Sequence, residues 1–287
     1  MSNIESKDFI HYDDLPKEEL RAFNKIINNI YRLHGVDFRQ YRSKCLRRRI
    51  VVGMHDARVN SFVDYLNFLI KHPDEYDSLL DRITINVSEF FRNPETFSAV
   101  RRNVIPSIIQ AKKEINASSI RVWSSGCATG EEPYSLAILL SEVLAELKEN
   151  LKIRIYATDI DKAALKRAEE GIYKEKALKE LKNYQVNSYF QKNEQGLYAI
   201  KPEFKTMIKF MYHNMISDQP LQRMDLIFCR NVIIYFSKEL QKLVYDNFYK
   251  ALAPKGYLVA GKTESLMDIN ESYFERINLQ ERVLRKK

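Results

Sequence analysis

The sequence predicts an α/β fold, with a doubly wound parallel sheet and a small antiparallel β insertion, preceded by a small all-α N-terminal domain. Over the first 80 or so residues, apolar side chains recur at helical spacing. After about residue 118, apolar runs that suit buried strands alternate with amphipathic helices. This alternation is typical of a parallel sheet covered by helices on both faces.

The N-terminal region is expected to contain four short helices. The first has its apolar face between residues 20 and 33, and Gly35 is a suitable stop signal. The others are expected over residues 42–58, 62–69 and 76–83, where apolar residues again follow the helical period.

Basic residues are concentrated in the second of these helices. Residues 39–58 contain seven Lys or Arg and one acid, Asp56, whereas residues 1–82 contain 14 basic and 13 acidic side chains. A nearly neutral region with one basic stripe favours a docking face over general polyanion binding. The alternative is an ordinary solvated helix face.

Four strands and three helices are expected in the α/β part. The strands are predicted at residues 120–124, 153–158, 225–229 and 257–261, and the helices at residues 133–148, 162–170 and 238–252. Residues 189–213 show no clear helix. Their apolar runs GLYAI and MIKFMYH predict the antiparallel insertion, at about residues 187–213.

A glycine-containing turn links the first strand to its helix. The motif VWSSGCATGEEPY passes through Gly126 and Gly130 to Pro133, which suits the first turn of a helix. Ligands of doubly wound sheets bind at such turns, where glycines let the backbone approach a nucleoside. A purely structural turn is the alternative, because the full GxGxxG is missing.

Acidic residues end the second strand. Asp159 stands where a carboxylate can accept hydrogen bonds from both ribose hydroxyls, and Asp161 is interpreted as the N-cap of the next helix. A glycine turn followed by an acid about thirty residues later fits either a dinucleotide or an S-adenosyl ligand. Local spacing does not separate the two.

Five short sequence motifs occur in order along the chain, namely TINVSEFFR, WSSGCATGEEPYS, ATDID, FCRNVIIYF and GYLVAGKTES. In this order they resemble the CheR-type chemotaxis receptor methyltransferases, and the similarity covers about residues 15–285. The resemblance implies a class I (Rossmann-like) methyltransferase. Such an enzyme transfers a methyl group from S-adenosylmethionine to glutamate side chains of methyl-accepting chemotaxis receptors, leaving glutamate methyl esters and S-adenosylhomocysteine.

The same resemblance implies the division of the chain. Residues 1–82 would form a helical domain that docks on the receptor, and residues 83–94 a linker carrying cofactor-site residues. Residues 95–287 would form the methyltransferase domain.

Cofactor contacts also follow from the resemblance. By position in the family motifs they fall on Asn86, Ser88, Arg92, Glu132, Asp159, Asn214, Met215, Arg230 and Asn231, and the turn residue Gly126 is added to them. Ser88 replaces the Thr of many relatives and keeps the hydroxyl. Without the resemblance, Asn231 would be interpreted as a helix cap.

Arg92 and Tyr235 are the expected catalytic residues. A glutamate carboxylate is already ionised at neutral pH, because its ordinary pKa is about 4.3, so it can attack the sulfonium methyl without a general base. No histidine lies inside the five motifs. Catalysis by orientation is expected, with Arg92 holding the carboxylate and Tyr235 donating a hydrogen bond. The apolar pair Phe90 and Phe91 is expected to pin the linker to the catalytic domain.

Receptor docking is expected to involve Arg42, Arg48 and Arg49. The resemblance implies that an arginine-bearing helix faces the receptor's methylation helices, and Arg49 is at a matching position. Val52, Gly53 and His55 stand where some relatives are basic, which shifts the expected footprint toward residues 42–49. The short stretch QKNEQG predicts an enzyme that does not bind a receptor C-terminal pentapeptide.

Composition excludes several other classes. The three cysteines are far apart with no CxxC pair, so neither a disulfide framework nor a metal site is expected. Without a secretory signal or an apolar span, a cytoplasmic protein that does not insert into membranes is expected, by default a monomer.

Three rival functions remain. A nucleic-acid methyltransferase fits the net charge of +8, but CRNVIIYF stands where an Asn-Pro-Pro-aromatic motif would hold a flipped base, so no nucleic-acid partner is expected. A non-catalytic sensor of S-adenosylmethionine could dispense with Arg92 and Tyr235, both of which are present. A dehydrogenase would need the full dinucleotide fingerprint.

Overall fold

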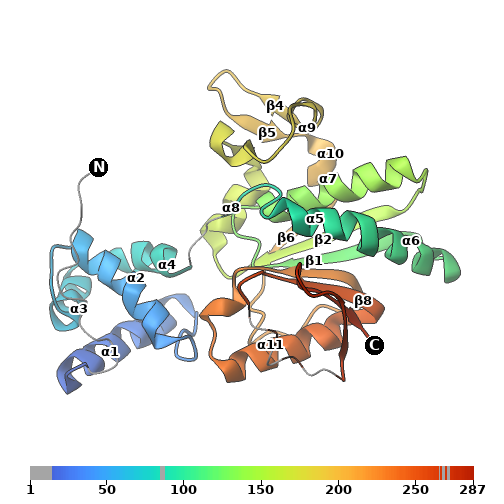
Figure 1. Cartoon of the computed structure of the whole chain (residues 1–287). Coiled ribbons are helices and arrows are strands. Elements are labelled where there is room, and N and C mark those ends of the chain that lie inside the picture. Colours follow the sequence, from blue (N-terminus) through green and yellow to red (C-terminus); the bar gives the residue numbers. More distant parts are fainter. Residues whose placement is uncertain (1–14, 85–87, 265, 267–268, 270–271) are drawn as a thin grey trace. The chain divides into compact units, whose positions relative to one another are not determined.

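The computed structural model describes residues 15–84, 88–264, 266, 269 and 272–287 (Figure 1). Its contacts divide the chain into two compact units. The first comprises Met1–Ile85 with Tyr235–Ser237, and the second Asn86–Ile234 with Lys238–Lys287.

The first unit contains the four predicted helices, which are α1 (Lys17–His34), α2 (Ser43–Asp56), α3 (Phe62–Lys71) and α4 (Glu75–Thr84). Helix α1 ends at Gly35, whose φ of 73° is the left-handed conformation that glycine adopts without steric cost. Helix α1 packs on α3 and α2 on α4. Ile26, Ile30, Ile50, Tyr65 and Leu79 are fully buried, so the predicted apolar faces do form a core.

The segment Tyr235–Ser237 belongs to this first unit. The backbone N–H of Arg42 donates to the carbonyl of Tyr235 at 2.8 Å, and Ser237 N donates to Gln40 O at 3.1 Å. Phe236 is buried and its ring packs edge-on against Tyr41. These contacts fix the segment on the loop that precedes α2.

A seven-stranded sheet organises the second unit, in the order β6-β2-β1-β7-β8-β10-β9. The neighbours from β6 to β8 are parallel, and β10 is antiparallel to both β8 and β9. The predicted doubly wound sheet is therefore confirmed. The strands are β1 (Ser119–Ser125), β2 (Lys152–Asp159), β6 (Ile208–Tyr212), β7 (Met224–Cys229), β8 (Leu252–Ala260), β9 (Phe274–Asn278) and β10 (Val283–Lys286).

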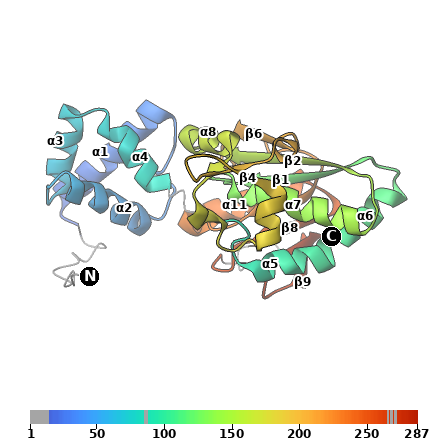
Figure 2. The same ribbon diagram turned by 90° about the horizontal axis from the view of Figure 1, so that it is seen from above.

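Helices cover both faces of this sheet (Figure 1). On one face, α5, α6 and α7 pack over alternate strand residues such as Val122 and Leu226. On the other, Phe248 of α11 contacts Trp123, and Leu165 of α8 packs against Ala157. Helix α8 lies beside β6 (Figure 2). The bounds are α5 (Pro94–Ala99), a π-helical turn (Val100–Val104), α6 (Ile105–Glu114), α7 (Glu131–Glu146), α8 (Lys162–Glu170) and α11 (Lys238–Ala251).

The insertion is antiparallel, as predicted, but its strands differ from the expected ones. A three-stranded sheet has the order β3-β5-β4, from β3 (Ile172–Tyr173), β5 (Tyr198–Ile200) and β4 (Phe190–Lys192). Three short helices accompany it, at η2 (Glu175–Leu178), α9 (Asn183–Tyr189) and α10 (Pro202–Lys205).

The run MIKFMYH does not belong to the insertion, so the boundary predicted at residue 213 is wrong. Its residues form β6, which pairs in parallel with β2 of the main sheet. Ile208 and Phe210 are partly buried against the core clusters of that sheet. A short apolar run predicts a strand but not its partner or direction, which depend on the surfaces that it buries.

Within the described residues, no helix is both long enough and apolar enough to traverse a bilayer.

Candidate active site

The glycine turn after β1 is built for close packing. Gly126 and Gly130 have φ of 77° and 95°, in the left-handed region that favours glycine. A Cβ on Gly126 would lie 2.5 Å from Cγ2 of Val232, and a Cβ on Gly130 would lie 2.9 Å from the Cβ of Ala168. The glycine at 126 therefore lets the residues after β7 approach the turn.

Asp159 at the end of β2 ties down the same turn. Its Oδ2 accepts a hydrogen bond from Ala128 N at 2.8 Å, and its Oδ1 accepts from Asp161 N at 3.0 Å. Burial raises the pKa of Asp159, opposed by these backbone N–H donors. Asp161 caps α8, since its Oδ1 accepts from Ala164 N at 2.9 Å, which confirms its predicted role.

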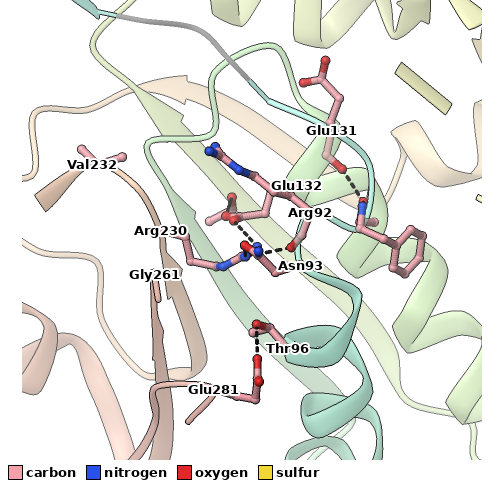
Figure 3. Close-up of polar contacts among 12 residues, drawn as sticks. Arg92, Asn93, Thr96, Glu131, Glu132, Arg230, Val232, Gly261 and Glu281 are labelled. Carbon is pink, nitrogen blue, oxygen red and sulfur yellow. Dashed lines mark hydrogen bonds and ion pairs between the residues drawn. The ribbon is translucent and has the colours of Figure 1, made fainter. Parts of the chain in front are cut away.

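Glu132, in the first turn of α7, is a mostly buried acid with two polar partners. Ser124 Oγ donates to its Oε1 at 2.8 Å, and Nη1 of Arg230 lies 3.7 Å from its Oε2. Burial raises the pKa of Glu132, while the positive charges of Arg230 and Arg92 and the Ser124 hydrogen bond lower it. Arg92 and Arg230 lie on either side of this carboxylate (Figure 3).

Arg230 follows β7 and connects the end of that strand to the linker. Its side chain is 2% exposed. Nη2 donates to the carbonyl of Arg92 at 2.8 Å and to Oδ1 of Asn93 at 2.6 Å. The guanidinium also lies over the Phe97 ring, 5.6 Å from its centroid. The polar contacts that the structure shows for this side chain are thus to the linker and to Glu132 (Figure 3).

The linker is anchored by the two phenylalanines, as predicted. Phe90 is fully buried between Tyr173 and Phe190, and Phe91 N donates to Ser135 Oγ at 2.9 Å. Phe91 and Asn93 flank Arg92 with φ of 50° and 59°. Positive φ at two non-glycine residues is costly, so the backbone on either side of Arg92 needs the support of such packing and hydrogen-bond contacts.

Other predicted cofactor residues have varied surroundings. Ser88 hydrogen-bonds Glu131, whose pKa is raised by burial. Asn214 is engaged in a local turn, because its Oδ1 accepts from Ile216 N at 3.0 Å. The Met215 sulfur accepts from Ser125 Oγ at 3.9 Å. Asn86 lies outside the described residues.

Asn231 has a left-handed backbone, with φ of 62°. Its Oδ1 is buried and accepts no hydrogen bond from the part of the chain that the structure describes. The Asn231 side chain therefore does not cap a helix, so the interpretation that the sequence suggests without the family resemblance is wrong. A buried acceptor without a donor leaves a hydrogen bond for a ligand to make.

The remaining predicted residues belong to the first unit. Tyr235 ends a short 3₁₀ turn (Ile233–Tyr235) and is half-buried. In α2, Arg48 is exposed and Arg49 half-buried. Arg42 is exposed, but its Nε donates to Phe236 O at 3.0 Å. Arg47, in the same basic stripe, lies over the Phe23 ring, so the stripe is only partly solvated.

Sequence reasoning missed two buried acids near the strand ends. Glu281 accepts from Thr96 Oγ1 at 2.7 Å and pairs with Lys262 at 3.1 Å. Glu264 accepts backbone hydrogen bonds from the residues after β7. Glu264 lies inside the motif GYLVAGKTES, where an acid soon after a strand end is the only sequence signal.

The chemistry of these groups fits a nucleoside-containing cofactor. A carboxylate at the end of β2, a glycine turn and the unfilled acceptor of Asn231 supply the polar groups that such a ligand needs. In the described ranges, no three His, Cys, Asp or Glu side chains are grouped so as to hold a metal ion.

A doubly wound sheet with this turn and acid defines a Rossmann-like, nucleoside-binding protein, and the family match identifies it as a methyltransferase. Residues 86–283 match the family model described as CheR methyltransferase, SAM binding domain, and residues 21–84 match the CheR methyltransferase all-alpha domain. The chain belongs to the CheR methyltransferase family. It is an S-adenosylmethionine-dependent methyltransferase.

Curated relatives agree with the family match. The chain is 32% identical to a chemotaxis protein methyltransferase of Listeria innocua over 91% of either chain. It is 30% identical to one of Borreliella burgdorferi, over 88% of this chain and 90% of that one. It also matches an uncharacterized 104.1 kDa protein of Rhodobacter capsulatus at 33% identity, over 89% of this chain and 27% of that protein. None of these comparisons supports action on nucleic acid.

Proposed function

We propose that this enzyme methylates glutamate side chains of a methyl-accepting chemotaxis receptor, with S-adenosylmethionine as the methyl donor. The observation that carries the proposal is the group formed by Arg92, Glu132 and Arg230. Two guanidiniums flank one mostly buried carboxylate, so the group has a net positive charge. An anionic acceptor such as a carboxylate fits that charge, whereas a neutral base gains nothing from it.

The cofactor would be held by residues at the carboxyl edge of the sheet. Asp159 has lone pairs for the ribose hydroxyls beside the backbone bonds that it accepts, and the Asn231 oxygen can accept from an amino group. The proposed set is completed by Asn86, Ser88, Arg92, Gly126, Glu132, Asn214, Met215 and Arg230. When bound, the sulfonium supplies an electrophilic methyl group.

Arg92 would orient the acceptor. Its planar guanidinium can hold a carboxylate through two parallel hydrogen bonds, which fixes the direction of the attacking oxygen. Glu132 and the buried Arg230 hold this side chain and its backbone in place. Tyr235 would donate a hydrogen bond to the same acceptor. No proton has to be removed, because a glutamate with the ordinary pKa of about 4.3 is ionised at neutral pH.

Receptor recognition would use the N-terminal helical domain, residues 1–82. The exposed Arg48 and the neighbouring Arg42 and Arg49 of the α2 region offer positive charge to acidic receptor helices. Residues 83–94 would act as the linker and residues 95–287 as the methyltransferase domain. The expected location is the cytoplasm, the expected state is a monomer, and a receptor pentapeptide is not expected to be needed.

The decisive experiment is methyl transfer from labelled S-adenosylmethionine to receptor-bearing membranes, followed by alkaline treatment. A carboxylate ester releases volatile labelled methanol, whereas a methylated base or amine does not. Label that enters RNA instead of receptors, or that resists alkali, would contradict the proposal. Titration with a receptor tail peptide tests the pentapeptide prediction, which micromolar binding would overturn.

A further inference from the structure

A buried carboxylate outside the predicted site joins the ends of two neighbouring parallel strands. Glu264 is 1% exposed. Its Oε1 accepts from the backbone N–H groups of Val232 and Ile233 at 3.0 and 3.2 Å, just after β7. Its Oε2 accepts from Gly261 N, just after β8. Because Cys229 and Ala260 are paired in register, one side chain ties together the two segments that leave these strands.

Backbone amides, rather than a salt bridge, satisfy this carboxylate. Across the described ranges no Lys or Arg forms an ion pair with Glu264, and Arg230 contributes only a weaker, distant attraction. Hydrogen bonds from N–H groups to an ionised acceptor are short and strong. Removing the acceptor would leave three buried donors to find new partners, so the turn would have to move.

The segment held in this way contains the predicted cofactor contact Asn231. Its φ of 62° is unusual for a residue with a side chain and needs support from its surroundings. Val232 packs closely against Gly126, because a Cβ added to Gly126 would lie 2.5 Å from Cγ2 of Val232. Val232 and Gly261 lie on one side of Arg230 and the linker residue Asn93 on the other (Figure 3). The two bonds to Glu264 thus hold Val232, and with it the neighbouring residue Asn231, at the glycine turn.

We propose that Glu264 is a positioning residue for the cofactor site, which acts by holding the Asn231–Val232 turn against Gly126. The proposal rests on the assignment of Asn231 to the cofactor site within the proposed function. It does not depend on which methyl acceptor the enzyme uses.

Glu264→Gln is the main test, because it keeps one acceptor oxygen and nearly the same volume. The amide NH₂ would face either Gly261 N–H or the Val232 and Ile233 N–H groups, so at least one bond is replaced by a repulsive contact. We expect the affinity for S-adenosylhomocysteine, measured by calorimetry on folded protein, to fall about tenfold or more.

Glu142→Gln is the matched control. Glu142 is also a mostly buried acid with several partners, Arg101, Gln185 and Tyr189, but it lies toward the C-terminal end of α7, on the side of the insertion. This variant should lose stability and change the affinity by less than about twofold. If both variants lose affinity alike, the effect is general destabilisation and the proposal is wrong.

Gly261→Ala tests the same turn from the other side. A Cβ at this position would lie 2.8 Å from Asn231 N and 3.0 Å from Oε2 of Glu264. We expect it to reproduce the loss of cofactor affinity. A folded Glu264→Gln enzyme with wild-type affinity would overturn the proposal, and so would a Glu264→Gln protein that is unfolded, since the role would then be to maintain the fold.

The proposed function can be refuted while the inference about Glu264 still stands. A wild-type enzyme that binds S-adenosylhomocysteine but methylates no receptor would refute the acceptor assignment, while the ratio of affinities between variants would still be readable.

Discussion

Two arginines of this chain, Arg48 and Arg230, have the same side chain but differ in burial and in their bonding partners. Arg48 is exposed on α2 of the first unit. Arg230 is 2% exposed in the second unit and bonds the Arg92 carbonyl, the Asn93 side chain and Glu132. An exposed arginine acts through its charge, which salt screens and which a lysine could replace. A buried arginine acts through hydrogen bonds and ion pairs of fixed geometry in the protein interior. The comparison separates docking by charge from catalysis by position.

The largest expected effect comes from removing the buried arginine. Arg230→Ala leaves the mostly buried Glu132 without its ion-pair partner and frees the linker around Arg92. Loss of one partner of a buried pair costs about 3–5 kcal/mol, so we expect a large fall in the free energy of unfolding, measured with urea. Arg48→Ala should change it by less than about 0.5 kcal/mol. Equal effects of the two substitutions would remove the distinction.

A pH titration extends the comparison to buried acids. Burial raises the pKa of Glu264 to about 7, from an unfolded value of 4.5. Between pH 4.5 and about 7, Glu264 therefore stays protonated in the folded state but is ionised in the unfolded state. The free energy of unfolding falls as the pH rises through this range and levels off above it. The full difference is about 3 kcal/mol.

Glu264→Gln should remove that part of the pH dependence of the unfolding free energy. Asp159, Glu131 and Glu132, whose pKa values are also raised by burial, act in the same direction and remain in the variant. The informative quantity is thus the difference between the two proteins at each pH. A difference that does not change between pH 4.5 and 7 would mean that Glu264 is already ionised throughout.

Arg92→Lys keeps the charge but loses the planar pair of donors. We expect turnover to fall by about a hundredfold or more, with S-adenosylhomocysteine still bound, because an ammonium cannot hold a carboxylate in one orientation. The measurement is single-turnover methyl transfer with saturating cofactor. Wild-type turnover in this variant would refute the orienting role.

The smallest effect is expected on the exposed face. Replacing Arg48 and Arg49 together by Glu should weaken receptor methylation by about tenfold at low salt, with unchanged cofactor affinity. The difference should shrink as salt rises, because the screening length falls to about 8 Å near 0.15 M. Replacing both by Lys should change little. Methylation that is insensitive to salt would contradict docking through α2.

Local pattern was sufficient for much of the fold. The alternation of apolar runs and amphipathic helices predicted the doubly wound sheet, and the four N-terminal helices, the Gly35 stop and the Asp161 cap are confirmed. The run MIKFMYH shows the limit, because its residues identify a strand but not its neighbour. Similarly, nothing near Arg230 in sequence indicates that it bonds Arg92 and Asn93.

The sequence by itself determined the fold class, the glycine turn with its acid and, through five ordered motifs, the family. These depend on periodicity and on short spacings, which the chain encodes locally. Only the tertiary structure decided that MIKFMYH joins the main sheet, that Arg230 supports the linker and that Glu264 binds the turn after β7. Each of these depends on groups far apart in the chain that meet only in the folded state, where most buried polar atoms find a partner.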